Sequence, residues 1–229
     1  MPALKRVGHK GADLVAPGNT IPSFQAALEA GVDMIEFDVL RLRDGRLVFA
    51  HDYEDAARRE PLTLDEGFDH LAGEAYGGLE LDIDMKLPGY EREVVQAVKS
   101  RGLAERTLIS SHYLESLDEI ARLAHGIPRG LSVPRVRRDY MKSPLAVPAY
   151  GVARWMRARL PGKIGRLMAD GRIQAVMSHW LLVSRRLVEV AHANGGEVYV
   201  WTVDDVRRIE RLHALGVHGV ITNDPRLFS

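Results

Sequence analysis

The sequence contains no cysteine. This absence excludes disulfide bonds, thiolate metal sites and a cysteine nucleophile, but it does not identify a cellular compartment. The 31 basic residues balance the 31 acidic ones, so a formal net charge of zero gives no indication of a nucleic-acid partner. No apolar run approaches the length of a membrane span, and residues 1–5 lack the apolar core of a signal peptide. We therefore expect a cytoplasmic protein.

The remaining composition is that of an ordinary globular protein. Apolar residues make up 46% of the chain and charged residues 27%, which is enough apolar side chain to form a sizeable core. A length of 229 residues is common for a single α/β barrel. We expect one domain over residues 1–229.

Strand patterns alternate with helical patterns along nearly the whole chain. The predicted strands are 6–8, 33–39, 46–50, 79–86, 107–110, 129–131, 173–177, 198–201 and 219–221. Strand–helix alternation favours a parallel sheet, and about eight such strands in one domain favour a (β/α)8 TIM barrel. A doubly wound open sheet is the competing architecture.

Two of the predicted helices have clear start signals. Residues 20–30 follow Asn19 or Thr20 as N-cap and carry a proline in the first turn, and Gly31 ends the helix. Residues 64–71 follow Thr63, with Glu66 three positions later in a capping-box spacing. Further helices are predicted at about 90–101, 113–124, 184–194 and 204–215.

Chemically active side chains gather near the carboxyl ends of the predicted strands. They are His9, Glu36, Asp38, His51, Asp84, Lys86, Ser110, Ser111, Trp201, Asn223 and Asp224. Barrel enzymes place their active sites at that end of the strands, so this distribution favours the barrel over the open sheet.

Glu36 and Asp38 form the most informative pair. Alternation along a strand places both carboxylates on one face, while Ile35, Phe37 and Val39 point to the other. Two carboxylates on one face repel each other unless a cation lies between them, and a divalent metal with oxygen ligands is the usual solution. In isolation the same pattern would also fit two surface acids on an edge strand.

A turn at Asp44-Gly45 leads from this strand into the next one, which ends at His51-Asp52. This run is typical of a hairpin. On its own the His-Asp pair would also fit a capping motif.

The segment 135–172 differs from the rest of the chain because it is dense in arginine and lysine and contains only Asp139 and Asp170 as acids. One interpretation is a solvated helix-and-loop insertion on the outside of the barrel. The other is a lid or a docking surface for phosphate head groups or anionic lipid. Aromatic residues among the basic residues would also fit a nucleic-acid surface. The neutral net charge and the acidic cluster argue against a nucleic-acid partner.

Several motifs resemble, in order and over nearly the whole chain, those of the glycerophosphodiester phosphodiesterase family. They are Gly8-His9-Lys10-Gly11, Pro17-Gly18-Asn19-Thr20, Gly31–Val39, Asp44-Gly45, His51-Asp52, Leu64-Asp65-Glu66, Leu81–Lys86, Trp201-Thr202-Val203 and Ile221–Pro225. The resemblance implies a TIM barrel, a bound Mg²⁺ or Ca²⁺, and cleavage of phosphodiesters by paired histidines. The expected activity is that of a metal-dependent phosphodiesterase that releases the head-group alcohol from glycerophosphodiesters or lysophospholipids.

The physical chemistry of the matched residues agrees with this resemblance. Glu36, Asp38 and Asp84 offer hard oxygen ligands for the metal, and Asp82 lies on the same strand face as an outer-shell candidate. The unperturbed pKa of a histidine side chain lies near neutrality, which suits one of His9 and His51 as the base and the other as the acid.

Three further residues are predicted to bind the substrate. Lys10 and Lys86 can balance charge on the phosphoryl oxygens. Trp201 stands where the family places an aromatic residue on the substrate wall, although plain barrel packing would also explain it. Whether water or a neighbouring hydroxyl of the substrate attacks phosphorus is left open.

Two departures from the family pattern bear on function. Gly18 replaces the usual glutamate and so removes one expected metal ligand, and Lys10 replaces an arginine, which trades a planar fork for a point charge. The remaining three carboxylates resemble the ligand set of the lysophospholipase D and spider-venom phospholipase D branch.

The departures also motivate an alternative, a catalytically impaired barrel that binds phosphodiesters or lipids. A sugar-phosphate aldolase or isomerase would leave His51-Asp52 without a role, and a nuclease is a weaker alternative.

Overall fold

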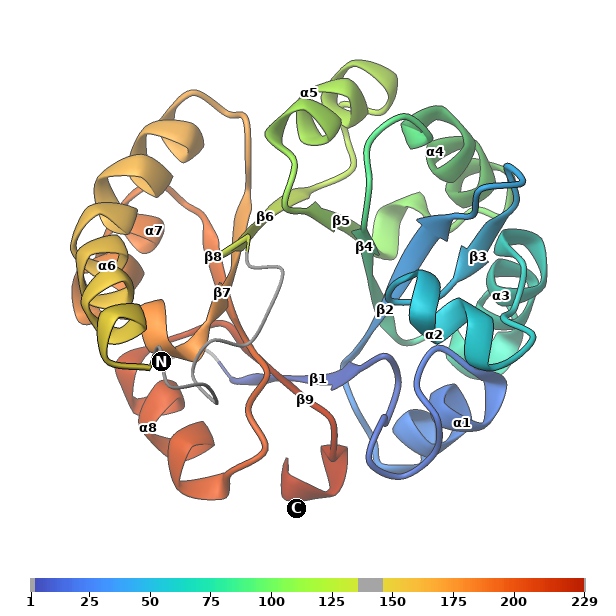
Figure 1. The fold of residues 1–229 in the computed structure, drawn as a ribbon, viewed down its shortest axis with the longest axis horizontal. Coiled ribbons are helices and arrows are strands. Elements are labelled where there is room, and N and C mark those ends of the chain that lie inside the picture. The colour runs from blue at the N-terminus through green and yellow to red at the C-terminus, as the bar shows by residue number, and fades with distance from the viewer. Residues whose placement is uncertain (1–2, 136–145, 229) are drawn as a thin grey trace.

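Eight parallel strands close into a barrel in the computed structural model, which describes residues 3–135 and 146–228 (Figure 1). The barrel strands are β1 (Lys5–His9), β2 (Met34–Arg41), β4 (Glu80–Met85), β5 (Thr107–Ser111), β6 (Arg129–Val133), β7 (Ala175–His179), β8 (Glu197–Trp201) and β9 (Gly219–Thr222). Each pairs in parallel with its neighbours, and β1 pairs with both β9 and β2, which closes the ring. The predicted TIM barrel is confirmed, and the open sheet is excluded.

The helices surround the ring of strands, as Figure 1 shows. They are α1 (Ile21–Glu29), α2 (Tyr53–Arg58), α3 (Leu64–Leu71), α4 (Glu91–Ser100), α5 (Leu114–Leu123), α6 (Ala146–Ala169), α7 (Arg185–Ala193) and α8 (Val206–Leu215). Thr20 caps α1 and Thr63 caps α3 through a capping box with Glu66, as predicted. No helix in the described part of the chain is both long and apolar enough to span a bilayer.

The segment between β2 and α3 contains two elements that do not belong to the alternation of barrel strands and outer helices. Strand β3 (Leu47–Phe49) pairs antiparallel with the end of β2, which confirms the predicted hairpin. The short helix α2 follows at once, capped by Asp52, and it was not predicted. None of its residues is buried, so it has no apolar stripe from which a helix could be recognised.

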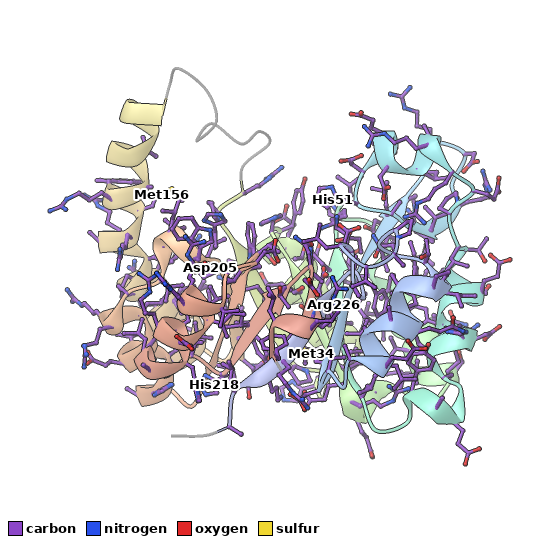
Figure 2. The ribbon with its side chains drawn as sticks, turned by 90° about the horizontal axis from the view of Figure 1, so that it is seen from below. Met34, His51, Met156, Asp205, His218 and Arg226 are labelled. Carbon is purple, nitrogen blue, oxygen red and sulfur yellow. The ribbon has the colours of Figure 1, made fainter. Side chains whose placement is uncertain are left out.

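Strand alternation divides the apolar residues into two layers. Side chains pointing outward, such as Phe37 and Ile83, pack under the helices in a large cluster. A smaller cluster fills the barrel interior near the amino ends of the strands, formed by Val7, Met34, Leu108, Ala175, Met177, Tyr199 and Ile221. In Figure 2 Met34 lies toward this lower end and His51 at the opposite, upper end. The carboxyl ends of the strands are thus left for polar residues.

The basic segment 135–172 contains α6, and residues 136–145 lie outside the described residues. The second half of α6 packs as the connection between β6 and β7, because Leu160, Ile164 and Leu167 are buried in the outer core. That half therefore occupies the place of an ordinary barrel helix and is not an exterior insertion. The exposed interpretation holds for residues 151–159, of which only Ala153 and Met156 are half-buried.

Candidate active site

Four acidic side chains lie on the inner face of two neighbouring strands. The register of β2 and β4 pairs Glu36 with Asp82 and Asp38 with Asp84, so the four form a two-by-two grid inside the barrel. All are at most 8% exposed. Carboxylate oxygens of Glu36, Asp38 and Asp84 lie within 4.8 Å of one another. The alternation that predicted this shared face is confirmed for both strands.

Lys86 balances part of this charge. Its ammonium lies 2.5 Å from Asp38 Oδ1 and 2.6 Å from Asp84 Oδ2. Burial would lower the pKa of Lys86, but the two carboxylates outweigh it and raise the pKa above its usual value. The lysine therefore stays charged next to the acids. One ammonium cannot neutralise four buried carboxylates.

The pKa values of the four acids therefore differ, so that some are charged and others protonated. Burial, together with the negative charge of Asp84, raises the pKa of Asp82 to about 8, and burial next to Asp38 raises the pKa of Glu36 well above its usual range. Burial acts the same way on Asp38, but Lys86 and His51 outweigh it and hold its pKa below the usual range. Without a further cation the grid keeps protons at neutral pH.

The grid fits a divalent cation by the chemistry of its donors. One oxygen each of Asp38, Asp82 and Asp84 is buried and accepts no hydrogen bond from the described residues, although the Asp38 oxygen contacts the Lys86 ammonium. Hard carboxylate oxygens are the ligands that Mg²⁺ and Ca²⁺ prefer. The Glu36, Asp38 and Asp84 set could therefore bind a divalent metal.

His9, at the end of β1, is held through a chain of side chains from the far end of the sequence. Its Nδ1 lies 2.5 Å from Asn223 Oδ1. The Asn223 amide donates to Asp204 Oδ2 at 2.7 Å, while Asp204 Oδ1 accepts from Thr222 Oγ1 and from the Asn223 backbone. Because a carboxylate only accepts, Asp204 forces the amide oxygen of Asn223 toward His9. His9 must therefore carry its proton on Nδ1.

The other ring nitrogen of His9 faces the acidic grid. His9 Nε2 lies 3.9 Å from Glu36 Oε2. Burial, with the positive charge of Lys10, lowers the pKa of His9 to about 4. The imidazole is thus neutral at physiological pH, and its Nε2 lone pair is available to accept a proton.

The loop from β1 to α1 braces the grid from the other side. Asn19, in a left-handed backbone conformation, donates from Nδ2 to Asp38 Oδ2 and accepts from the Asp38 backbone N–H. Lys10 donates its backbone N–H to Glu36 at 2.9 Å and directs its ammonium to Asp13. These bonds set the direction of two of the three candidate metal ligands.

Gly18 lies where this loop leaves no space for a side chain. A Cβ built there would lie 2.6 Å from Asp13 Oδ1 and 2.7 Å from Lys10 Cβ. The Gly18 backbone N–H donates to Asp13, and its carbonyl accepts from Arg59 at 2.8 Å. A glutamate at this position is therefore incompatible with this loop. The three-carboxylate set forms without it.

His51 occupies a different environment at the upper rim in Figure 2. Its side chain is 50% exposed, and its Nδ1 lies 3.0 Å from Asp52 Oδ2. Its backbone N–H donates to Asp55 at the start of α2. His51 is close enough to Asp38 to contribute to the lowered pKa of that acid.

Trp201, at the end of β8, belongs to an aromatic wall across the barrel from β2. Its indole N–H donates to the Met177 carbonyl. The ring centroids of His179 and His112 lie 5.2 Å and 6.4 Å from Trp201 in edge-to-face arrangements. Trp201 also packs against the inner core, so its position is consistent with both substrate contact and packing.

The structure thus brings together nearly all of the predicted site residues at one end of the barrel. The Lys10 ammonium pairs directly with Asp13 at 3.1 Å, and Asp38 and Glu36 are close enough to help raise its pKa. Sequence reasoning placed Asn223 among the polar residues at the strand ends and considered Asn19 only as a helix cap, so it gave neither its orienting role, and it missed Asp204. The first two stand inside matched motifs that indicated them, whereas Asp204 had no such signal.

Comparison with known proteins identifies the family of this barrel. The sequence pattern of the glycerophosphoryl diester phosphodiesterase family matches residues 9–69 and 62–227. The glycerophosphodiester phosphodiesterase of Caldanaerobacter subterraneus subsp. tengcongensis is 29% identical over 96% of this chain and 93% of its own length. These matches support no assignment to the lysophospholipase D or venom branch.

Solved structures agree on the fold. The glycerophosphodiester phosphodiesterase of Agrobacterium tumefaciens superposes with a TM-score of 0.69 at 21% identity, over 99% of this chain and 97% of that one. An Oleispira antarctica phosphodiesterase in complex with the product sn-glycerol-3-phosphate gives a TM-score of 0.70 at 21% identity, over 97% and 94%. Since the family pattern covers nearly the whole sequence, this chain belongs to the glycerophosphoryl diester phosphodiesterase family and is a phosphoric diester hydrolase.

Proposed function

We propose that the protein is a divalent-metal-dependent phosphodiesterase that cleaves glycerophosphodiesters and releases the head-group alcohol. The observation that carries this proposal is the buried Glu36, Asp38 and Asp84 set beside a neutral, oriented His9. A bound Mg²⁺ or Ca²⁺ would supply Lewis-acid polarisation of a non-bridging phosphate oxygen. The product bound to the Oleispira antarctica relative supports glycerol-3-phosphate esters as the substrate class.

Two histidines move the protons in this proposal. His9 Nε2 accepts the proton of the attacking oxygen, because its Nδ1–H is committed to Asn223. His51 donates a proton to the leaving alkoxide, and the Asp52 carboxylate next to its ring holds the orientation of the imidazole. One P–O bond forms at the attacking oxygen and the P–O bond to the leaving alcohol breaks. Each proton transfer contributes about 10²–10⁴ in rate.

The remaining residues hold the reactants. Lys86 keeps Asp38 and Asp84 in place and adds positive charge near the phosphoryl group. Trp201 supplies a flat wall opposite the acids. The attacking group is water or a neighbouring hydroxyl of the substrate, and the second route would leave a cyclic phosphate.

The test is a ³¹P NMR time course on chelator-stripped protein with glycerophosphocholine, to which Mg²⁺ or Ca²⁺ is returned. We expect loss of the diester signal only after metal is added, and no loss with His9→Ala. A cyclic-phosphate signal would identify intramolecular attack. Folded protein that leaves the diester unchanged with either metal would contradict the proposal and favour a barrel that only binds phosphodiesters.

Lysophospholipids are the second candidate substrates. The observation that favours them is a group of exposed apolar side chains close to the catalytic end, where Leu14 is 63% and Tyr53 45% exposed. An acyl chain could cover these surfaces. Lysophosphatidylcholine in the same time course tests this alternative, and a rate below that of glycerophosphocholine at every lipid concentration would exclude it as the preferred substrate.

A further inference from the structure

Residues 151–159 of α6 are unusual in their charge. The whole helix, residues 146–169, contains no acidic residue. Residues 151–159 carry three exposed arginines, Arg154, Arg157 and Arg159. The charge is therefore of one sign, although the chain as a whole is neutral.

The same nine residues expose large apolar groups. Val152 and Trp155 are both 57% exposed, and three positions apart they share one side of the helix. The guanidinium of Arg159 lies over the Trp155 ring at 4.9 Å from its centroid. A tryptophan paired with arginine presents an apolar body and a charged edge, which suits a membrane interface.

Packing explains why residues 151–159 are exposed. From Leu160 onward α6 is fixed on α7, and Gly165 allows the close approach, because a Cβ there would lie 2.7 Å from Val190. Of residues 151–159 only Ala153 and Met156 pack against the core. In Figure 2 Met156 lies at about the same height as His51, and the beginning of α6 rises above both.

Further exposed apolar side chains lie near the catalytic end of the barrel. Leu14 and Val15 stand in the loop that follows β1, and Tyr53 follows His51 by two positions. Helix α2, on the other side of the mouth, mixes Glu54 and Asp55 with Arg58 and so does not present charge of one sign.

We propose that residues 151–159 bind the surface of an anionic phospholipid bilayer, with the mouth of the barrel turned toward the lipid. The arginines would pair with lipid phosphates, and each basic residue near such a surface contributes about a fivefold gain in affinity. Trp155 and Val152 would enter the boundary between head groups and acyl chains. A nucleic acid would match the arginines but leave Val152 and Leu14 without an apolar partner.

Vesicle flotation tests this surface without requiring turnover. The full chain is mixed with vesicles of phosphatidylcholine alone or with a third of phosphatidylglycerol. We expect binding to the anionic vesicles only, and a decrease at high salt because screening shortens the range of the attraction. Arg154→Glu with Arg157→Glu should weaken binding by roughly 30-fold or more. Trp155→Ala should weaken binding with less change in its salt dependence.

A matched control separates this site from net charge. Arg122→Glu with Arg211→Glu makes the same change in charge at exposed positions of α5 and α8. We expect this control to keep nearly full binding. Equal losses in the two double variants, or no binding of the wild type to anionic vesicles, would overturn the proposal. So would binding of a short DNA duplex, lost with Arg154→Glu and Arg157→Glu, in place of vesicles.

Discussion

The surroundings of His9 and His51 differ in rigidity, although both histidines serve the same candidate site. The His9 side chain is 19% exposed and ends a chain of hydrogen bonds through Asn223 to Asp204. The His51 side chain is 50% exposed, and its partner Asp52 is 55% exposed. His9 is thus oriented before any substrate arrives, whereas His51 stands on a rim that substrate would cover.

This difference assigns the two roles. A base needs a free lone pair with a fixed direction, which the protonated Nδ1 of His9 leaves at Nε2. An acid that serves leaving alcohols of different sizes can lie on an exposed rim. Substitutions of each histidine, and then of the carboxylate that supports it, test this difference.

Removal of either imidazole should have the largest effect. We expect His9→Ala and His51→Ala each to lower kcat/KM for glycerophosphocholine by about 10²–10⁴ at saturating metal. Initial rates by ³¹P NMR measure this.

A p-nitrophenyl phosphodiester of glycerol separates the two variants, because its leaving group needs no acid. His51→Ala should regain most of its rate with this substrate, and His9→Ala should not. Equal recovery of both variants would show that the two roles are assigned incorrectly.

Substitution of Asp204, which orients His9 through Asn223, should have the next largest effect on activity. Asp204→Asn can turn its own amide and so no longer fixes that of Asn223, which removes the preference for the Nδ1–H form of His9. We expect kcat to fall about 10–100-fold, as outer partners of site residues typically cost. The ¹⁵N shifts of His9 should report the change of tautomer.

Asp205→Asn is the control for this variant. Asp205 is the neighbouring residue and caps α8 by accepting from the Arg208 backbone N–H. Asparagine caps a helix about as well as aspartate, so activity and the His9 tautomer should be unchanged. A loss of activity in Asp204→Asn without any change in the ¹⁵N shifts would contradict the orienting role.

These two variants also show what the sequence could and could not predict. Alternation in 33–39 and 79–86 was sufficient to place Glu36, Asp38 and Asp84 on one face, because strand geometry is local. The motif Ile221–Pro225 pointed to Asn223. Asp204 lies in the loop after β8, and its contact with Asn223 depends on how β8 and β9 sit beside β1 in the closed barrel. No local pattern encodes that contact.

The secondary structure was likewise predicted where its signals are local. Capping signals located α1 and α3 because Thr20 and Thr63 act on their own first turns. Helix α2 was missed because it buries nothing. The two halves of α6 were not separated because its basic residues run through both, and only packing against α7 distinguishes them.

The pH dependence of stability in chelator-treated protein should report on the burial of His9. The folded pKa of His9, about 4, lies below the unfolded value of about 6.5. Its neutral form therefore stabilises the fold fully above pH 6.5, and this contribution is lost as the pH falls toward 4.

Replacing the imidazole by a group that does not titrate should remove this dependence. The difference in unfolding free energy between wild type and His9→Gln should change by up to about 3 kcal/mol over that range. Urea titrations at a series of pH values measure it. A difference that stays constant from pH 7 to about 4 would contradict the lowered pKa.

Substitution of Asp52, the carboxylate beside His51, should have the smallest effect on activity. Asp52 is more than half exposed, and an exposed ion pair contributes about 0.2–1 kcal/mol, which limits the loss of kcat/KM in Asp52→Asn to roughly fivefold. Asparagine would keep the cap of α2, where Asp52 accepts from the Asp55 backbone N–H, so folding should not change. Steady-state rates of Asp52→Asn and Asp204→Asn under the same conditions measure the contrast. If Asp52→Asn lost as much activity as Asp204→Asn, His51 would have to be as firmly positioned in the working enzyme as His9, and closure of the α2 rim over the substrate would then be part of the reaction.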